Sequence, residues 1–134
     1  MTVYVDSSAL LKLYIEEDSS SDAREILLIS SQWVTAMHTL VEVRRALTRI
    51  LDGYALSEAK NRFTEHWQRM EVVELDEATC ERAAEFAERT GVRTLDALHL
   101  GAADRVGGGA LALATFDTRQ AEAARSLGWS VLGA

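Results

Sequence analysis

The segment VYVDSSAL, residues 3–10, decides the fold of this chain. The β-branched and aromatic run from Val3 to Val5 predicts a short buried strand, and Asp6, Ser7 and Ser8 directly after it predict the start of a helix. A strand that passes straight into a helix begins a β–α unit. Repeated β–α units build parallel sheets with helices packed on both faces.

The same alternation continues along the rest of the chain. Short apolar or β-branched runs predict four further strands at residues 33–35, 72–75, 110–116 and 129–132. Residues 16–22 are polar and are predicted to form a loop. Helical periodicity of the apolar residues predicts helices around residues 23–27, 40–50, 56–70, 78–89, 95–106 and 118–127. The prediction is therefore an α/β fold with a parallel sheet between two layers of helices.

Length and composition fit one globular domain. The chain has 134 residues, and a single domain over residues 1–134 is expected. With 48% hydrophobic residues it can form an ordinary core. Neither a basic-then-apolar leader nor an apolar run of about 20 residues is present, so we expect a cytoplasmic protein without membrane contacts. The single cysteine, Cys80, is interpreted as core filling in a reducing compartment.

The net charge of −7 argues against a protein that holds nucleic acid simply by covering its phosphates with Lys and Arg. The positions of the acids are more informative. Asp6 directly follows the first predicted strand, and Asp117 directly follows Thr115 and Phe116 at the end of the fourth. Ligands of parallel α/β sheets bind at this carboxyl edge. Taken one at a time, both aspartates are equally well explained as helix N-caps.

Two further acids lie on predicted helices. Asp96 follows Thr94, which is expected to be the N-cap, and the helix after it is nearly all apolar. A carboxylate in such a buried setting needs a partner or a metal ion, and His99 is the partner expected within the helix. Glu42 lies off the apolar stripe of its own helix, where an exposed ion pair with Arg45 is the ordinary interpretation.

Considered jointly, the four acids favour a different interpretation. Carboxylates that fold into one place cannot all stay ionised without a compensating cation. Oxygen ligands without a cysteine or histidine motif point to Mg²⁺ or Mn²⁺ rather than zinc. His38 and His66 have no metal-ligand partner at a useful spacing in this interpretation. Such a cation supplies what hydrolysis of a phosphodiester needs.

The segments that carry the acids resemble those of PIN-domain ribonucleases, most closely the toxin component of VapBC-type toxin–antitoxin systems. Any one segment is a weak pattern, but all four in this order are specific, and the resemblance covers essentially the whole chain. The four segments are VYVDSSAL (residues 3–10), LVEVRRAL (residues 40–47), RTLDALHL (residues 93–100) and ATFDTR (residues 114–119).

The resemblance implies a PIN-like three-layer fold with five parallel strands in the order 3-2-1-4-5. It implies an endoribonuclease that depends on Mg²⁺ or Mn²⁺ and hydrolyses RNA, of the tRNA or rRNA class, with a metal-activated water. It also implies a homodimer and a cognate VapB-type antitoxin that blocks the acidic cleft. Asp6, Glu42, Asp96 and Asp117 match the catalytic and metal-binding quartet of the family.

Four other residues are expected to support that quartet. Thr115 resembles the family's hydroxyl residue beside the acids, and Ser7 is expected to act similarly. Arg93 is expected to hold phosphates, together with other arginines at positions 44, 45, 49 and 89, although solvent-exposed helix charge is the alternative. His99 is expected to orient Asp96.

Three alternatives remain open from the sequence. A phosphoacceptor receiver domain shares the length and the sheet, but it needs an adjacent acidic pair after the first strand, and Asp6 is followed by Ser7. A haloacid-dehalogenase-type phosphatase needs a second aspartate where Ser8 stands. The third alternative is a PIN-like module that has lost catalysis and only binds a partner.

Overall fold

Five short strands form one parallel sheet in the order β3-β2-β1-β4-β5. The computed structural model describes residues 1–134, with Gly108 described in its backbone only. The expected α/β fold and strand order are confirmed. In chain order the elements are β1 (Thr2–Val5), α1 (Ser7–Leu11), α2 (Ser20–Leu28), β2 (Gln32–Ala36), α3 (Thr39–Ile50), α4 (Gly53–Arg69), β3 (Glu71–Val73), α5 (Glu77–Thr90), α6 (Thr94–Arg105), the 3-10 turn η1 (Gly108–Ala110), β4 (Ala112–Thr115), α7 (Thr118–Ser126) and β5 (Val131–Gly133).

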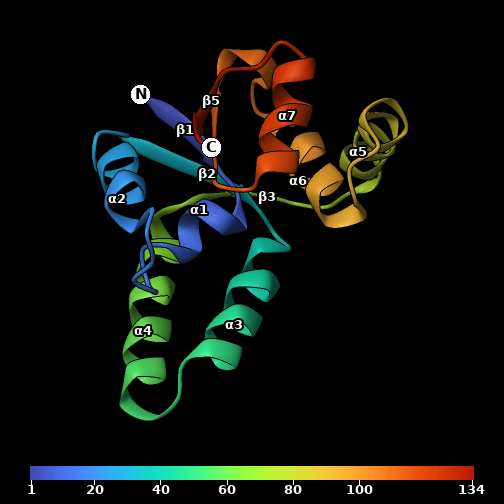
Figure 1. Ribbon diagram of the computed structural model, residues 1–134. Helices are drawn as coiled ribbons and strands as arrows, with labels where there is room; N and C mark the ends of the chain where they lie inside the picture. Colours follow the sequence, from blue (N-terminus) through green and yellow to red (C-terminus); the bar gives the residue numbers. More distant parts are fainter.

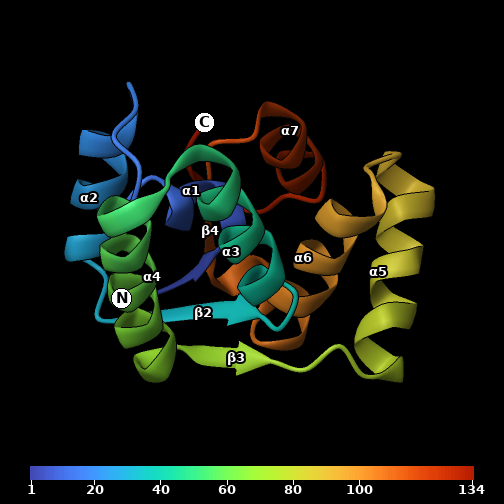
Figure 2. The ribbon, with the colours of Figure 1, turned by 90° about the horizontal axis from the view of Figure 1, so that it is seen from below.

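The helices form a layer on each face of the sheet (Figure 1). Successive side chains of a strand point to opposite faces, so β1 contributes to two separate cores. Val3 and Val5 pack with residues of α1 to α4, whereas Tyr4 packs with residues of α5 to α7. Turned by 90°, the molecule shows β2 and β3 lying side by side and pointing the same way (Figure 2).

The central position of β1 fixes where the acids lie. Its neighbours are β2 on one side and β4 on the other, with Val5 opposite Ala114 in the parallel register. The amide of Asp6 continues this pairing by donating to the carbonyl of Ala114 at 3.1 Å. The residues that follow β1 and β4 are therefore neighbours at the carboxyl edge of the sheet.

Several predicted boundaries differ from the structure because a strand ends where its partner ends. β3 stops at Val73, opposite Ala36, which is the last residue of β2, so residues 74 and 75 are not in the strand. β4 begins at Ala112, opposite Val3, rather than at residue 110. The predicted loop over residues 16–22 is also too long, since α2 begins at Ser20, whose hydroxyl bonds to the backbone of Ile15.

Cys80 is exposed, so its interpretation as core filling is wrong. The buried stripe of α5 consists of Thr79, Ala83 and Phe86, and its three- and four-residue steps leave the neighbouring position 80 outside the core. None of the helices in the described chain combines the length and the apolar character that crossing a membrane requires.

The helix α6, which carries Asp96 and His99, is held close to α5. Gly101 lies at their contact, where a Cβ atom would come within 2.8 Å of the carbonyl oxygen of Thr79 and 2.9 Å of the Cβ of Ala83. The absence of a side chain at this position lets the two helix backbones approach. This packing fixes the position of the first turn of α6 at the sheet edge.

Candidate metal centre

All four sequence-predicted acids lie at the start of a helix. Asp6 is the N-cap of α1 and Asp117 is the N-cap of α7, whereas Glu42 lies in the first turn of α3 and Asp96 in the first turn of α6. The unpaired N–H groups and the positive end of the helix dipole favour carboxylates at such positions. The fold thus brings acids from four separate segments toward one edge of the sheet.

Three hydrogen-bond donors hold the carboxylate of Asp6. Its Oδ1 accepts hydrogen bonds from the Ser8 hydroxyl at 2.7 Å and the Ala9 amide at 3.1 Å, and its Oδ2 accepts one from the Thr115 hydroxyl at 2.5 Å. Only 3% of its surface is exposed. Burial raises the pKa of Asp6, although the charge of His99 and these hydrogen bonds act in the opposite direction.

Thr115 also connects Asp6 to Asp117. Its hydroxyl oxygen accepts a hydrogen bond from the Asp117 amide at 3.1 Å. Asp117 in turn caps α7, because its Oδ1 accepts from the amides of Arg119 at 2.9 Å and Gln120 at 3.2 Å. The N-cap interpretation is therefore right for both aspartates, and capping is also what places their carboxylates.

The negative charges of the other three acids act on Asp96. Burial raises its pKa, and the negative charges of Asp117, Asp6 and Glu42 raise it further, whereas the charge of His99 lowers it. The four carboxyl groups therefore share one electrostatic neighbourhood. Within the described residues the Asp96 carboxylate accepts no hydrogen bond.

Two expectations about the surroundings of Asp96 are wrong. The hydrogen bonds of His99 go to other residues, so His99 does not orient Asp96 by direct contact. The N-cap of α6 is Arg93 rather than Thr94, and its side chain makes no capping hydrogen bond. The chain enters α6 in extended backbone at Arg93, which makes Thr94 the first helical residue.

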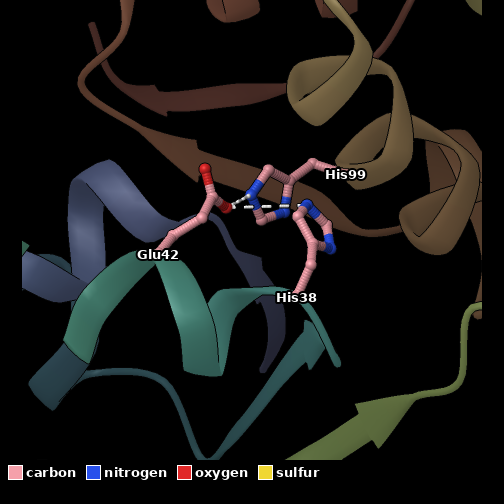
Figure 3. Close-up of side chains that lie close together, drawn as sticks. All are labelled: His38, Glu42 and His99. Atoms are coloured by element: carbon pink, nitrogen blue, oxygen red, sulfur yellow. Dashed lines mark hydrogen bonds and ion pairs between the residues drawn. The ribbon is translucent and has the colours of Figure 1, made fainter. Parts of the chain in front are cut away.

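Glu42 faces into the site. Its Oε1 accepts a hydrogen bond from the Ser7 hydroxyl at 2.5 Å and lies 2.9 Å from Nε2 of His99, with Nε2 of His38 at 3.5 Å (Figure 3). The alternative interpretation of Glu42, an ion pair with Arg45, is not found in the part of the chain that is described. Burial alone would raise the pKa of Glu42, but the hydrogen bond and charge of His99, with the Ser7 bond, hold it below its usual value.

His99 connects Glu42 to the core. Its Nδ1 lies 2.8 Å from the hydroxyl of Tyr4, and its side chain is 2% exposed. A carboxylate only accepts hydrogen bonds, so Nε2 of His99 carries the proton toward Glu42 and Nδ1 accepts from Tyr4 in the neutral ring. Since Tyr4 belongs to β1, the central strand determines the position of Glu42 through His99.

His38 precedes α3, and its ring lies against that of His99 with centroids 4.1 Å apart and the ring planes tilted by 42°. Its Nε2 lies 3.1 Å from the carbonyl oxygen of Leu95, while its buried Nδ1 has no partner among the described residues. Burial, together with the charge of His99, lowers the pKa of His38 to about 4, so the ring is neutral at pH 7.

Sequence analysis missed three residues of this site: Tyr4, Ser8 and Gln120. The interpretation that His38 has no ligand partner at a useful spacing is wrong, because Glu42 and His99 lie beside it. Gln120 is fully buried and donates to the carbonyl oxygen of Asp96 at 3.1 Å. A signal for His38 was present, because it precedes Glu42 by four residues and so lies one helical turn away. Tyr4 and Gln120 had no comparable signal, since their contacts join segments far apart in the chain.

The arginines expected near the site are exposed. Arg93 lies at the entrance to α6 and Arg89 near the end of α5, both at the surface. Arg44, Arg45 and Arg49 line an open groove on α3 and α4 together with Lys60. These arginines are exposed at the surface, where an anionic partner can contact them. The groove includes residues of α3, the helix that carries Glu42.

The donor set fits a hard divalent cation. Four carboxylates offer oxygen ligands, as Mg²⁺ and Mn²⁺ prefer. The Asp96 carboxylate has no hydrogen bond in the described structure, and three neighbouring negative charges raise its pKa. A cation bound here removes this repulsion. Asp6, Glu42, Asp96 and Asp117 each offer carboxylate oxygens at this edge of the sheet.

The family profile and a curated relative both place this chain in the same family. The PIN domain profile matches residues 3–126 of the chain. Ribonuclease VapC46 of Mycobacterium tuberculosis is 34% identical over 131 residues, which cover 97% of this chain and 95% of that protein.

Solved structures share the fold at lower identity. The Mycobacterium tuberculosis toxin VapC20, described as cleaving the sarcin–ricin loop, superposes with a TM-score of 0.74 at 19% identity over 90% of this chain and 94% of that one. The VapBC-5 toxin–antitoxin structure of the same organism gives a TM-score of 0.66 at 19% identity, covering 99% and 98%. At these identities the likeness shows the fold alone.

Proposed function

The chain belongs to the PIN domain family, and on this premise we propose that it is a metal-dependent endoribonuclease acting as the toxin of a VapBC-type toxin–antitoxin pair. The full-length similarity to a protein named as a ribonuclease supports the activity. The receiver-domain and phosphatase alternatives lose their basis, because the family match covers residues 3–126.

The observation that carries the proposal is the set of charges around Asp96. Burial and the charges of Asp117, Asp6 and Glu42 all raise its pKa. Such an arrangement is unfavourable for a structural role alone, since helix capping does not require several carboxylates to raise the pKa of one of them. It is favourable once a divalent cation binds among them. We assign Mg²⁺ or Mn²⁺ to this site.

When bound, such a cation polarises a phosphoryl oxygen and lowers the pKa of a water bound to it. Asp6, Asp96 and Asp117 are proposed as its ligands, with Glu42 either a fourth ligand or the group that positions the attacking water. Hydrolysis then leaves a 3′ hydroxyl on one fragment and a 5′ phosphate on the other.

The supporting residues act by fixing the carboxylates. Thr115 holds Oδ2 of Asp6 and the amide of Asp117, so it sets the spacing of two acids. Ser7 and His99 together fix Oε1 of Glu42. Arg93 is proposed to contact substrate phosphates at the surface, where its fixed positive charge offsets the acidic character of the protein.

The proposed substrate is structured RNA of the tRNA or rRNA class, encountered in the cytoplasm. VapC20, which shares this fold, is described as cleaving the sarcin–ricin loop. The proposed partners are a cognate VapB-type antitoxin and a second copy of this chain. The exposed groove lined by Arg44, Arg45, Arg49 and Lys60 offers positive charge for an acidic antitoxin segment or for RNA.

Cleavage of RNA by the purified chain tests the proposal directly. Total RNA is incubated with the wild type in Mg²⁺, in Mn²⁺ and in chelator, and the cut ends are mapped. We expect cleavage that requires the cation and disappears in Asp6→Asn and Asp96→Asn. His66→Gln is the matched control, because His66 contacts Tyr14 at 2.6 Å and takes no part in the acidic cluster.

Circular dichroism establishes that the variants are folded. Equal cleavage by the wild type and folded Asp96→Asn would attribute the activity to a contaminant and overturn the proposal. Such a result would favour a PIN-like module that binds a partner without catalysis.

A further inference from the structure

A second set of ligand atoms lies beside the acidic cluster. His38 and Glu42 come from the start of α3, and His99 from α6. Oε1 of Glu42 lies 2.9 Å from Nε2 of His99 and 3.5 Å from Nε2 of His38, and one ligand atom from each of the three residues lies within 4.8 Å of the others. The three side chains point toward one another (Figure 3).

The chemistry of this set differs from that of the carboxylates. Two imidazoles with one glutamate form a ligand set of zinc sites that keep a fourth position open. In a tetrahedral site with bonds of about 2.0–2.1 Å, ligand atoms lie about 3.3 Å apart. The separations from Glu42 to the two rings fall on either side of that value, so small side-chain movements would complete the site.

The surroundings of the two rings supply a second, independent observation. Ligand histidines are usually held by a hydrogen bond to their other nitrogen. Nδ1 of His99 has this contact, with the hydroxyl of the fully buried Tyr4. His38 is 8% exposed and its Nδ1 has no partner within the described residues, so His99 is the ring that is already held as a ligand histidine would be.

We propose that His38, Glu42 and His99 form a second cation site for Zn²⁺, distinct from the acidic quartet but sharing Glu42 with it. Each neutral ring binds through the lone pair of Nε2, and the His38 ring gives up its contact with the carbonyl oxygen of Leu95. The proton on that nitrogen moves to Nδ1 of the same ring, so no proton is released from either histidine. The Tyr4 hydroxyl then accepts from Nδ1 of His99 instead of donating to it, which a phenol does equally well.

Because Glu42 belongs to both proposed cation sites, binding at one affects the other. A Zn²⁺ ion held by the two histidines withdraws Glu42 from the acidic quartet. Zinc therefore inhibits cleavage that Mg²⁺ supports, and this part rests on the proposed function. Binding of zinc itself does not depend on that function.

Zinc titration of metal-free protein tests the site. The wild type is stripped with a chelator, returned to buffer with excess Mg²⁺, and titrated calorimetrically with Zn²⁺, with Co²⁺ absorption as a probe of tetrahedral nitrogen ligation. We expect one site per chain, weakened at least about tenfold by His38→Gln. Glu42→Gln is the second ligand variant, chosen because Glu42 is partly exposed and its substitution leaves the core intact.

Two controls locate the ion. His66→Gln removes a histidine outside the site, and Asp96→Asn removes a carboxylate of the quartet only. His66→Gln is expected to bind Zn²⁺ as the wild type does, and Asp96→Asn at least as tightly, because a weakened Mg²⁺ site competes less for Glu42. Unchanged affinity in both His38→Gln and Glu42→Gln would overturn the proposal, and so would absent binding in the wild type or loss of binding in Asp96→Asn. If the wild type binds zinc through His38 but does not cleave RNA in Mg²⁺, the proposed function fails while this site stands.

Discussion

Replacing Thr115 with valine isolates the contact that links two of the acids. Valine matches threonine in shape, so Thr115→Val removes the hydroxyl and leaves the fully buried packing of β4 nearly unchanged. The variant loses the hydrogen bond to Oδ2 of Asp6 and the acceptor for the Asp117 amide. Thr115→Ser is the matched control, because it keeps the hydroxyl and loses only a methyl group.

The size of the effect follows from the charge of Asp6. A hydrogen bond to a charged group contributes about 1.5–3 kcal/mol, against about 0.5–1.5 kcal/mol for a neutral one. The Asp117 amide lies in a partly exposed residue that water can reach, so its lost acceptor adds little. We expect Thr115→Val to lower the free energy of unfolding by about 2 kcal/mol at pH 7, and Thr115→Ser by about 0.8 kcal/mol.

Urea unfolding in the presence of a chelator measures the difference. With an m-value of about 2 kcal/mol/M, the midpoint of Thr115→Val is expected about 1 M below that of the wild type. The Thr115 bond favours the ionised form of Asp6, so the wild type loses its advantage as the pH falls through the pKa of Asp6. Equal midpoints for the valine and serine variants, or a gap that does not change with pH, would refute the assignment of Thr115 as the group that holds Asp6.

Three further predictions concern other parts of the molecule. Asp96→Asn is expected to stabilise the chelated protein at pH 7, because the folded state raises the pKa of Asp96 above its ordinary value of 3.8. The gain should vanish below pH 3.8, and denaturant unfolding at pH 7 and below pH 3.8 checks this. Burial lowers the pKa of His66 beneath 6.5, so the free energy of unfolding should decrease as the pH falls below 6.5, and His66→Gln should reduce that slope in an unfolding series. Gly101→Ala is expected to destabilise the protein by about 1–3 kcal/mol because its Cβ would meet the backbone of Thr79 at 2.8 Å; a melting temperature equal to that of the wild type would contradict this.

The sequence predicted the architecture well because periodicity and helix starts are local properties. The run Val3 to Val5 followed by Asp6 contains the strand, the turn and the cap within a few residues. Strand ends were predicted less well, since the end of β3 is set by the end of β2 rather than by its own residues. Cys80 was misplaced because Ala83, Ala84 and Ala87, which follow it in the helix, did not reveal which stripe of α5 is buried.

The acids of the candidate site were visible in the sequence, but the groups that hold them were not. Asp6 and Asp117 follow strands directly, which made their shared edge predictable. The expectation that His99 pairs with Asp96 assumed that a near neighbour on the same helix is the partner. The ring instead reaches Glu42, which is 57 residues away in the chain. Contacts of this kind depend on how α3 and α6 approach each other, which no local pattern encodes.

The end of β1 explains why two different donor sets occur at one edge of the sheet. Tyr4 and Asp6 are two residues apart, so both side chains leave the strand on the same face. Tyr4 fixes His99, which fixes Glu42, while Asp6 reaches Thr115 on β4. Ser7, the next residue, donates to the same oxygen of Glu42. Any displacement of this short segment therefore moves the histidine and the carboxylate ligands of the two proposed sites together. Glu42 is the residue that the two sites share.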